Sequence, residues 1–232
     1  MTPTKQGSVR FFEFSGITVF VHWSWFAVAM FSFQNRGGIY SSPVWNIYEY
    51  LGLFAIVLMH EFGHSLACRQ TGGSADQIVL WPLGGVAYVA PPPRPGAVLW
   101  SIAAGPLVNV GLLPVLFLAK KYVISNPAIP DDVVRLVATL AIINLGILIF
   151  NMLPIYPLDG GQILRSLLWF WVGPVKSLLI ATSIGFVGAA GLVGLAIWQE
   201  SIWLGIMAGF VFLNCRGAWL YAKAMSDRTN YR

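Results

Sequence analysis

Long apolar segments are the feature that most limits how this chain of 232 residues can fold. A helix needs about 20 apolar residues to cross the hydrocarbon core of a bilayer. The chain is 57% hydrophobic and 10% charged, so one soluble core cannot bury all of its apolar segments. The sequence therefore predicts an all-α membrane protein with about six transmembrane helices. The segments lie near residues 20–34, 46–68, 97–119, 134–172, 176–198 and 201–222.

The fourth segment, residues 134–172, is too long for a single crossing. Pro154 and Pro157 lie near its middle, and proline breaks a helix because it lacks the backbone donor. Irregular backbone at membrane depth is tolerated only where protein or water surrounds it. We therefore expect a broken element, with a helix to about Phe150, an irregular stretch, and a second helix from about Gly161.

Two short β-rich pairs lie at the edges of the apolar segments. Each consists of two runs of β-branched and aromatic residues that flank a turn. This pattern predicts a small β-hairpin or sheet at the cytoplasmic face of the membrane. Residues 77–81 and 86–90 flank a turn at 82–85, and residues 9–14 and 17–21 flank Ser15-Gly16.

The formal net charge of +5 is explained by membrane topology and anionic lipid headgroups rather than by nucleic-acid binding. With six crossings both termini lie on one side, which also carries most of the Lys and Arg residues. This asymmetry predicts cytoplasmic termini. We expect a multi-pass integral protein of the cell (plasma) membrane. The positions on that side are Lys5, Arg10, Arg69, Arg94, Lys176, Arg216, Lys223, Arg228 and Arg232, against Arg36, Lys120, Lys121 and Arg135 on the other.

The run His60-Glu61-Phe62-Gly63-His64 lies inside the second apolar segment. Residues four apart on a helix lie on one face, about 6 Å from each other, so both imidazoles can bind one ion with Glu61 beside them. Ionisable groups inside a membrane are costly, which disfavours a chance match or a surface salt-bridge cluster. The motif predicts a zinc site in which Glu61 is the general base for peptide-bond hydrolysis.

A catalytic zinc site uses three protein ligands and leaves a position for water, so the two histidines need a partner. Asp159 is the other acidic residue at the expected membrane depth, which makes it the candidate third ligand. It precedes Gly160 and Gly161, and it could also cap the helix that resumes there. The remaining histidine, His22, fits an interfacial or hydrogen-bonded role, and Cys68 fits packing in an apolar helix.

Three asparagines, Asn109, Asn144 and Asn151, lie within or at the ends of apolar segments, where an unpaired amide is expensive. Hydrogen bonding between helices explains Asn144. For Asn109, substrate contact and helix packing are both open. Asn151 begins the irregular stretch, where a side-chain donor could stabilise an oxyanion or hold a substrate backbone.

Four ordered elements of the chain resemble the site-2 protease family of intramembrane zinc metalloproteases. Residues 60–64 match the family's H-E-x-G-H element, and residues 151–161 contain its N-x-x-P-x-x-x-L-D-G element. Residues 103–109 and residues 82–85 also resemble recurring family segments. The similarity covers roughly the whole chain.

The resemblance implies one zinc ion per chain. Its ligands would be His60, His64 and Asp159, with Glu61 as general base and Asn151 as a helper at the substrate carbonyl. An extended client segment could pair with the edge of the 77–90 hairpin. The predicted substrate-binding residues are Asn109, Gly84 and Gly85.

The sequence thus predicts a zinc-dependent intramembrane endopeptidase that cuts in or near the transmembrane segment of membrane-protein clients. The lipid bilayer is its other predicted partner, no nucleic acid is expected, and no oligomeric state is indicated. We expect residues 1–232 to form a single domain with no room for the PDZ or CBS modules of many family members. The alternatives are a metal-ion transporter, which would need polar residues beyond Asn144, and an inactive protein that binds transmembrane helices, which the intact Glu61 disfavours.

Overall fold

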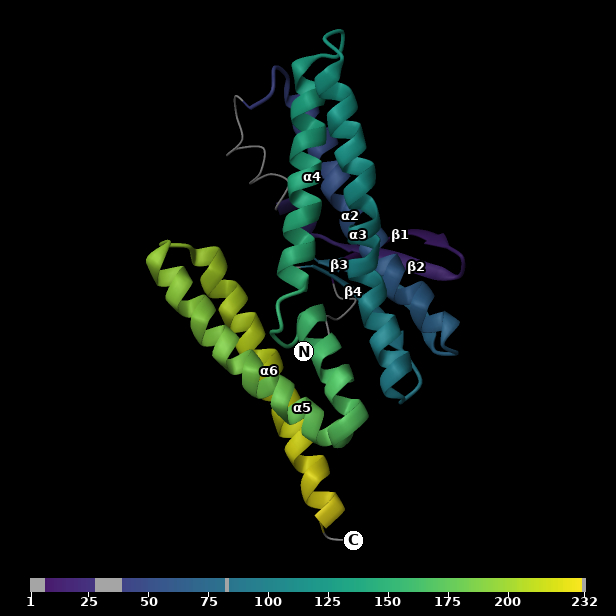
Figure 1. Ribbon diagram of the computed structural model, residues 1–232, viewed down its shortest axis with the longest axis vertical. Coiled ribbons are helices and arrows are strands. Elements are labelled where there is room, and N and C mark those ends of the chain that lie inside the picture. Colours follow the sequence, from purple (N-terminus) through teal and green to yellow (C-terminus); the bar gives the residue numbers. More distant parts are fainter. Residues whose placement is uncertain (1–6, 28–38, 82–83, 231–232) are drawn as a thin grey trace. The chain divides into compact units, whose positions relative to one another are not determined.

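The computed structural model describes residues 7–27, 39–81 and 84–230 (Figure 1). Five helices in these ranges are long and apolar enough to cross a membrane, and a small four-stranded sheet accompanies them. The chain is therefore a mostly helical integral membrane protein, as the sequence predicts. The helices are α2 (Pro43–Gln70), α3 (Pro95–Ser125), α4 (Asp131–Asn151), α5 (Asp159–Trp198) and α6 (Ile202–Asn230), and the strands are β1 (Ser8–Phe14), β2 (Ile17–His22), β3 (Ser74–Trp81) and β4 (Gly84–Ala90).

The first expected span, residues 20–34, differs from the structure over its described part. Residues up to His22 belong to strand β2, and residues 24–27 are helical. Residues 28–38 lie outside the described part of the chain. The β-branched residues of β2 alternate between buried and half-buried positions, which suits a strand on a sheet better than the start of a helix.

The break predicted in the fourth segment is confirmed. Helix α4 ends at Asn151, and α5 begins at Asp159. The expected segments up to 172 and from 176 are joined in α5 through Gly173, whose φ of 80° lies in the left-handed region. Glycine adopts this conformation without a steric penalty, and the following Pro174 cannot donate to the preceding turn. One element therefore contains two helical segments with a local break.

The chain divides into two compact units, and each is described by itself. The sheet unit comprises Pro3–Ala90 and Ala104–Ile149, and the α5–α6 unit contains Pro91–Ala103 and Phe150–Arg232. In the α5–α6 unit the two long helices lie side by side (Figure 1).

The sheet has the strand order β1-β2-β3-β4. Both predicted hairpins are present, because β1 pairs with β2 and β3 pairs with β4 in antiparallel fashion. The two hairpins are joined by parallel pairing of β2 with β3, and α2 lies in the connection between these two strands. Gly84 and Gly85 were expected in a turn, but they pair with Trp81 and Leu80 as the first residues of β4.

One face of α2 packs against the sheet. The buried core of this contact includes Ile17, Ile78 and Leu80, and side chains of α2 from Tyr50 to Phe62 pack against it. The helix also approaches α3 closely, since a Cβ added at Gly63 would come within 3.0 Å of the backbone of α3. Helix α2 is therefore fixed between the sheet and α3, as small residues at helix contacts allow.

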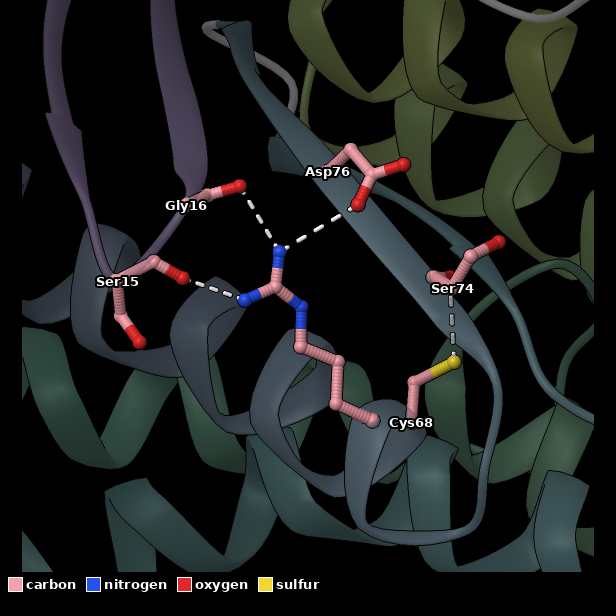
Figure 2. Close-up of polar contacts among 6 residues, drawn as sticks. Ser15, Gly16, Cys68, Ser74 and Asp76 are labelled. Carbon is pink, nitrogen blue, oxygen red and sulfur yellow. Dashed lines mark hydrogen bonds and ion pairs between the residues drawn. The ribbon is translucent and has the colours of Figure 1, made fainter.

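The C-terminal end of α2 is tied to both hairpins (Figure 2). The Arg69 guanidinium donates to the carbonyl oxygens of Ser15 at 2.5 Å and Gly16 at 2.9 Å, in the turn between β1 and β2. The Cys68 thiol donates to the carbonyl oxygen of Ser74 at the start of β3, at 3.4 Å. These bonds fix the end of the helix that carries the histidine motif.

Candidate metal centre

His60 and His64 lie one turn apart on α2, and both side chains are buried, with 4% and 6% exposed. Their Nε2 atoms are 3.1 Å apart. Two nitrogens that each bind one tetrahedral zinc ion at about 2.0–2.1 Å are about 3.3 Å apart. The spacing of the imidazoles therefore fits a shared metal ion.

Helix α3 leaves room for the two imidazoles at Gly105. A Cβ added there would come within 3.0 Å of the Nε2 atoms of both His60 and His64. Any side chain at this position would occupy the space next to the atoms that face a metal. Sequence reasoning missed this role, because a glycine inside an apolar helix has no distinctive pattern.

Asn109 lies one helical turn after Gly105, and its Oδ1 atom is 2.6 Å from Nδ1 of His60. Its Nδ2 group donates to Oδ1 of Asn144 on α4 at 2.8 Å, and Nδ2 of Asn144 donates to the backbone oxygen of Asn109 at 3.0 Å. Both asparagines are fully buried. The helix-to-helix bonding predicted for Asn144 is confirmed, while substrate contact by Asn109 stays a prediction.

Glu61 is also buried, with 5% of its surface exposed. Its Oε2 atom accepts a hydrogen bond of 2.9 Å from the backbone N–H of Ala87. Ala87 belongs to β4, which is the last strand of the sheet. The bond holds the carboxylate at the junction between α2 and the edge of the sheet, one residue away from His60.

Asp159 belongs to the α5–α6 unit, where it is the first residue of α5 and is 8% exposed. Leu158, rather than Asp159, occupies the N-cap position of this helix, so the N-cap alternative for Asp159 is wrong. A carboxylate in the first turn is favoured by the partial positive charge of a helix N-terminus.

Two glycines allow the loop before Asp159 to fold back on the start of α5. Added Cβ atoms at Gly160 and Gly161 would come within 3.0 Å of the backbone of residues 152–153 and 155–156, respectively. Any larger side chain at either position would push the loop away from the helix. The glycines of the D-G-G sequence therefore fix the backbone that carries Asp159.

The loop is also attached to α6. The thiol of Cys215 donates to the backbone oxygen of Tyr156 at 3.0 Å, and Ile155 and Tyr156 pack against the core between α5 and α6. Sequence reasoning missed Cys215, because the contact joins positions 59 residues apart.

The remaining predicted residues have the following positions. Asn151 is the last residue of α4, and Gly84 and Gly85 open strand β4. His22 bonds to Ser24 through Nδ1 at 2.5 Å and stacks on a tryptophan ring, in agreement with its predicted hydrogen-bonded role. The structure brings His60, Glu61, His64 and Asn109 together in the sheet unit, while Asp159 and Asn151 belong to the α5–α6 unit.

A buried H-E-x-x-H pair on an apolar helix of membrane-spanning length is the arrangement of an intramembrane metallopeptidase. Residues 48–126 and 118–195 match the sequence profile of peptidase family M50. The chain belongs to this family, which contains the site-2 proteases.

Individual relatives agree with this assignment. The zinc metalloprotease MJ0392 of Methanocaldococcus jannaschii is 34% identical over 178 residues, which cover 77% of this chain and 50% of that protein. The putative zinc metalloprotease Rip3 of Mycobacterium tuberculosis is 29% identical over 228 residues, covering 87% of this chain and 56% of that protein. The chain thus spans about half the length of these relatives.

A solved structure is also similar. The site-2 protease from Methanocaldococcus jannaschii has a TM-score of 0.65 and 28% sequence identity to this chain. The match covers 91% of this chain and 95% of that structure. The similarity to the family therefore extends over most of the chain, beyond its short motifs.

Proposed function

We propose that this chain is a zinc-dependent intramembrane endopeptidase, which hydrolyses a peptide bond in or near the transmembrane segment of client membrane proteins. The observation that carries the proposal is the buried pair of His60 and His64, with Nε2 atoms 3.1 Å apart and Glu61 beside them on an apolar helix. The family membership and the names of two relatives as zinc metalloproteases support it.

We propose His60, His64 and Asp159 as the protein ligands of one zinc ion. All three side chains are buried, and they form a set of the residue types that bind metal ions. Two imidazoles and one carboxylate are a donor set suited to zinc, and three protein ligands leave a further coordination position open. The room that Gly105 leaves beside the imidazoles supports the same assignment.

A zinc ion in this site would supply Lewis-acid chemistry, because it makes water acidic enough to attack at neutral pH and polarises the scissile carbonyl. The Glu61 carboxylate would accept the proton of the attacking water and later deliver it to the leaving amine. The bond from the Ala87 N–H orients this carboxylate. Asn151 would donate to the substrate carbonyl oxygen, where negative charge develops.

The substrate would bind as an extended strand along β4. A transmembrane helix hides its carbonyl groups in backbone hydrogen bonds, so a client must unwind locally before cleavage. Strand β4 ends the sheet, and its Ala87 amide lies at the general base, so an added strand there would run close to Glu61. Gly84 and Gly85 would allow a substrate backbone to approach closely.

We also propose that the chain lies in the plasma membrane with its termini in the cytoplasm. The Lys and Arg asymmetry supports the cytoplasmic position of the termini. The histidine pair lies in the C-terminal half of α2. In this orientation the metal centre would work in the cytoplasmic half of the bilayer.

The decisive experiment compares zinc content with cleavage of a helix-destabilised transmembrane peptide in detergent. Glu61→Gln should keep about one zinc ion per chain and lose turnover, because ligation survives while proton transfer does not. His60→Ala should lose the zinc. Glu13→Gln, at an exposed ion pair on β1, is the matched control and should behave as wild type.

Retained cleavage in the Glu61→Gln variant, or a wild-type zinc content in the His60→Ala variant, would exclude the proposal. Zinc flux into liposomes that contain the wild-type chain, without peptide cleavage, would instead support the alternative that the chain is a metal-ion transporter.

A further inference from the structure

A continuous line of hydrogen bonds runs from α4 through α3 to the imidazole of His60. Nδ2 of Asn144 donates to the backbone oxygen of Asn109 at 3.0 Å, and Nδ2 of Asn109 donates to Oδ1 of Asn144 at 2.8 Å. Oδ1 of Asn109 then lies 2.6 Å from Nδ1 of His60. All four groups lie within the sheet unit.

The backbone carbonyl at one end fixes the direction of every bond in this line. A carbonyl oxygen can only accept, so Asn144 must point its amino group at it and its Oδ1 atom at Asn109. That Oδ1 atom can also only accept, so Asn109 must point its amino group at Asn144. Its own Oδ1 atom therefore faces His60, and the proton of this last bond belongs to Nδ1 of the imidazole.

We infer that Asn109 and Asn144 are positioning residues that select the Nδ1–H tautomer of His60 and leave its Nε2 atom unprotonated toward the metal. The inference rests on the proposed function and deepens it, because it explains how one ligand is prepared before metal arrives. A neutral histidine carries its proton on one nitrogen only, so a bond that holds it on Nδ1 makes Nε2 an acceptor.

Burial makes the selection effective. Asn109 and Asn144 are fully buried and His60 is 4% exposed, so water has little access to replace these bonds. A flip of the Asn109 amide would place its amino group against a nitrogen that already carries a proton and its oxygen against Oδ1 of Asn144. The bonds of Asn109 to His60 and to Asn144 would then be lost together. This coupling holds the His60 ring in one orientation as well as in one tautomer.

The test measures zinc affinity by chelator competition and the His60 tautomer by nitrogen NMR of histidine-labelled protein in detergent without metal. The chain has three histidines, so the signals can be assigned with His22→Gln and His64→Gln variants. Asn109→Leu removes the acceptor, and it should weaken zinc binding by about 10–100-fold and shift the proton of His60 to Nε2.

Two further variants separate tautomer selection from packing. Asn109→Asp keeps an acceptor beside Nδ1, so it should keep the Nδ1–H tautomer and bind zinc at least about tenfold more tightly than Asn109→Leu. Asn144→Leu removes the constraint on Asn109, so His60 should populate both tautomers. The matched control is Asn214→Leu, which removes a half-buried amide from α6 that donates to the backbone oxygen of Phe210 one turn earlier, and it should match the wild type.

The inference is overturned if Asn109→Leu keeps the zinc affinity and the tautomer of the Asn214→Leu control, while His60→Ala loses zinc as proposed above. Zinc retained by His60→Ala would instead overturn the metal site itself. If Asn109→Leu does not fold, the Asn144→Leu variant tests the inference. An unchanged Nδ1–H tautomer of His60 in that variant refutes the inference, and a mixture of tautomers supports it.

Discussion

Two residues of α3, Gly105 and Asn109, set the surroundings of the His60 and His64 imidazoles. Gly105 presents only backbone to both Nε2 atoms, and Asn109, one turn further along α3, bonds to the opposite edge of the His60 ring. One turn of α3 therefore supplies both the space and the orientation for the histidine pair. The spacing of the histidines makes a metal site possible, and these two residues of α3 complete its surroundings.

The substitution Gly105→Ala tests the need for this space. The added methyl group would overlap the space of both Nε2 atoms, so we expect zinc affinity to fall by about tenfold or more. The helix itself should not suffer, since alanine favours helices more than glycine by about 1 kcal/mol. Chelator competition measures the affinity.

The matched control is Gly111→Ala on the same helix, where an added Cβ meets nothing within 4 Å. It should bind zinc as the wild type does. Equal affinity in the Gly105→Ala and Gly111→Ala variants would show that the imidazoles do not need the space beside α3.

Among the elements, α2 carries the motif and is held along its length. The sheet packs on one face, Ala87 of β4 bonds to Glu61, and the guanidinium of Arg69 bonds to the turn between β1 and β2. Arg69 also forms an ion pair of 3.4 Å with Asp76 on β3. The sheet therefore serves as a frame that sets the position of the catalytic helix.

Replacing Arg69 tests this frame. Arg69→Ala removes two bonds from a charged donor to backbone carbonyls, so the free energy of unfolding should fall by about 1–2 kcal/mol. Arg10→Ala breaks an exposed ion pair with Glu13 and should cost less than about 0.5 kcal/mol. Denaturant unfolding in detergent measures both, and equal losses would contradict a special role for Arg69.

Strand β4 allows a test of substrate pairing. Amides of a strand point alternately to its two sides, so the N–H of Val89 points to the same side as that of Ala87, which bonds to Glu61. Val89→Pro removes this outward donor and should reduce peptide cleavage by about tenfold, as expected for about 1.4 kcal/mol of lost binding, with zinc content unchanged. Val89→Ala keeps the donor and should cleave as the wild type does, so equal activity of the two variants would argue against pairing along β4.

Over the whole molecule, the proposed ligands come from segments far apart in sequence and from both compact units. His60 and His64 belong to the sheet unit, and Asp159 begins α5 in the other. A ligand that binds only the folded state stabilises it by mass action. Zinc should therefore stabilise the folded state of the complete chain, and not of the sheet unit alone.

Thermal unfolding in detergent tests this expectation. At zinc concentrations about 100 times the Kd, the stabilisation should be about 2.7 kcal/mol and the melting temperature should rise. Asp159→Ala should lose most of the rise, whereas Asp131→Ala, in the first turn of α4, should keep it. A rise of equal size in both variants would remove Asp159 from the ligand set.

The sequence alone determined the features that short segments encode. The long apolar helices among the described residues follow from the length of helix that a bilayer requires, and the break near Pro154 and Pro157 follows from the lost backbone donor. The facing pair of His60 and His64 follows from helical periodicity, and the two hairpins follow from β-branched runs around turns. Each depends on residues within one or two turns or strands of each other.

Only the tertiary structure decided the contacts between distant segments. The parallel pairing of β2 with β3, the space at Gly105, and the bonds from Asn109 to His60 and from Ala87 to Glu61 join residues 26 or more positions apart. Hydropathy and periodicity predict which face of a helix or strand is buried, but they do not predict which side chains of other elements contact that face. That choice is made by packing, because close-packed helices and strands fit together in few ways.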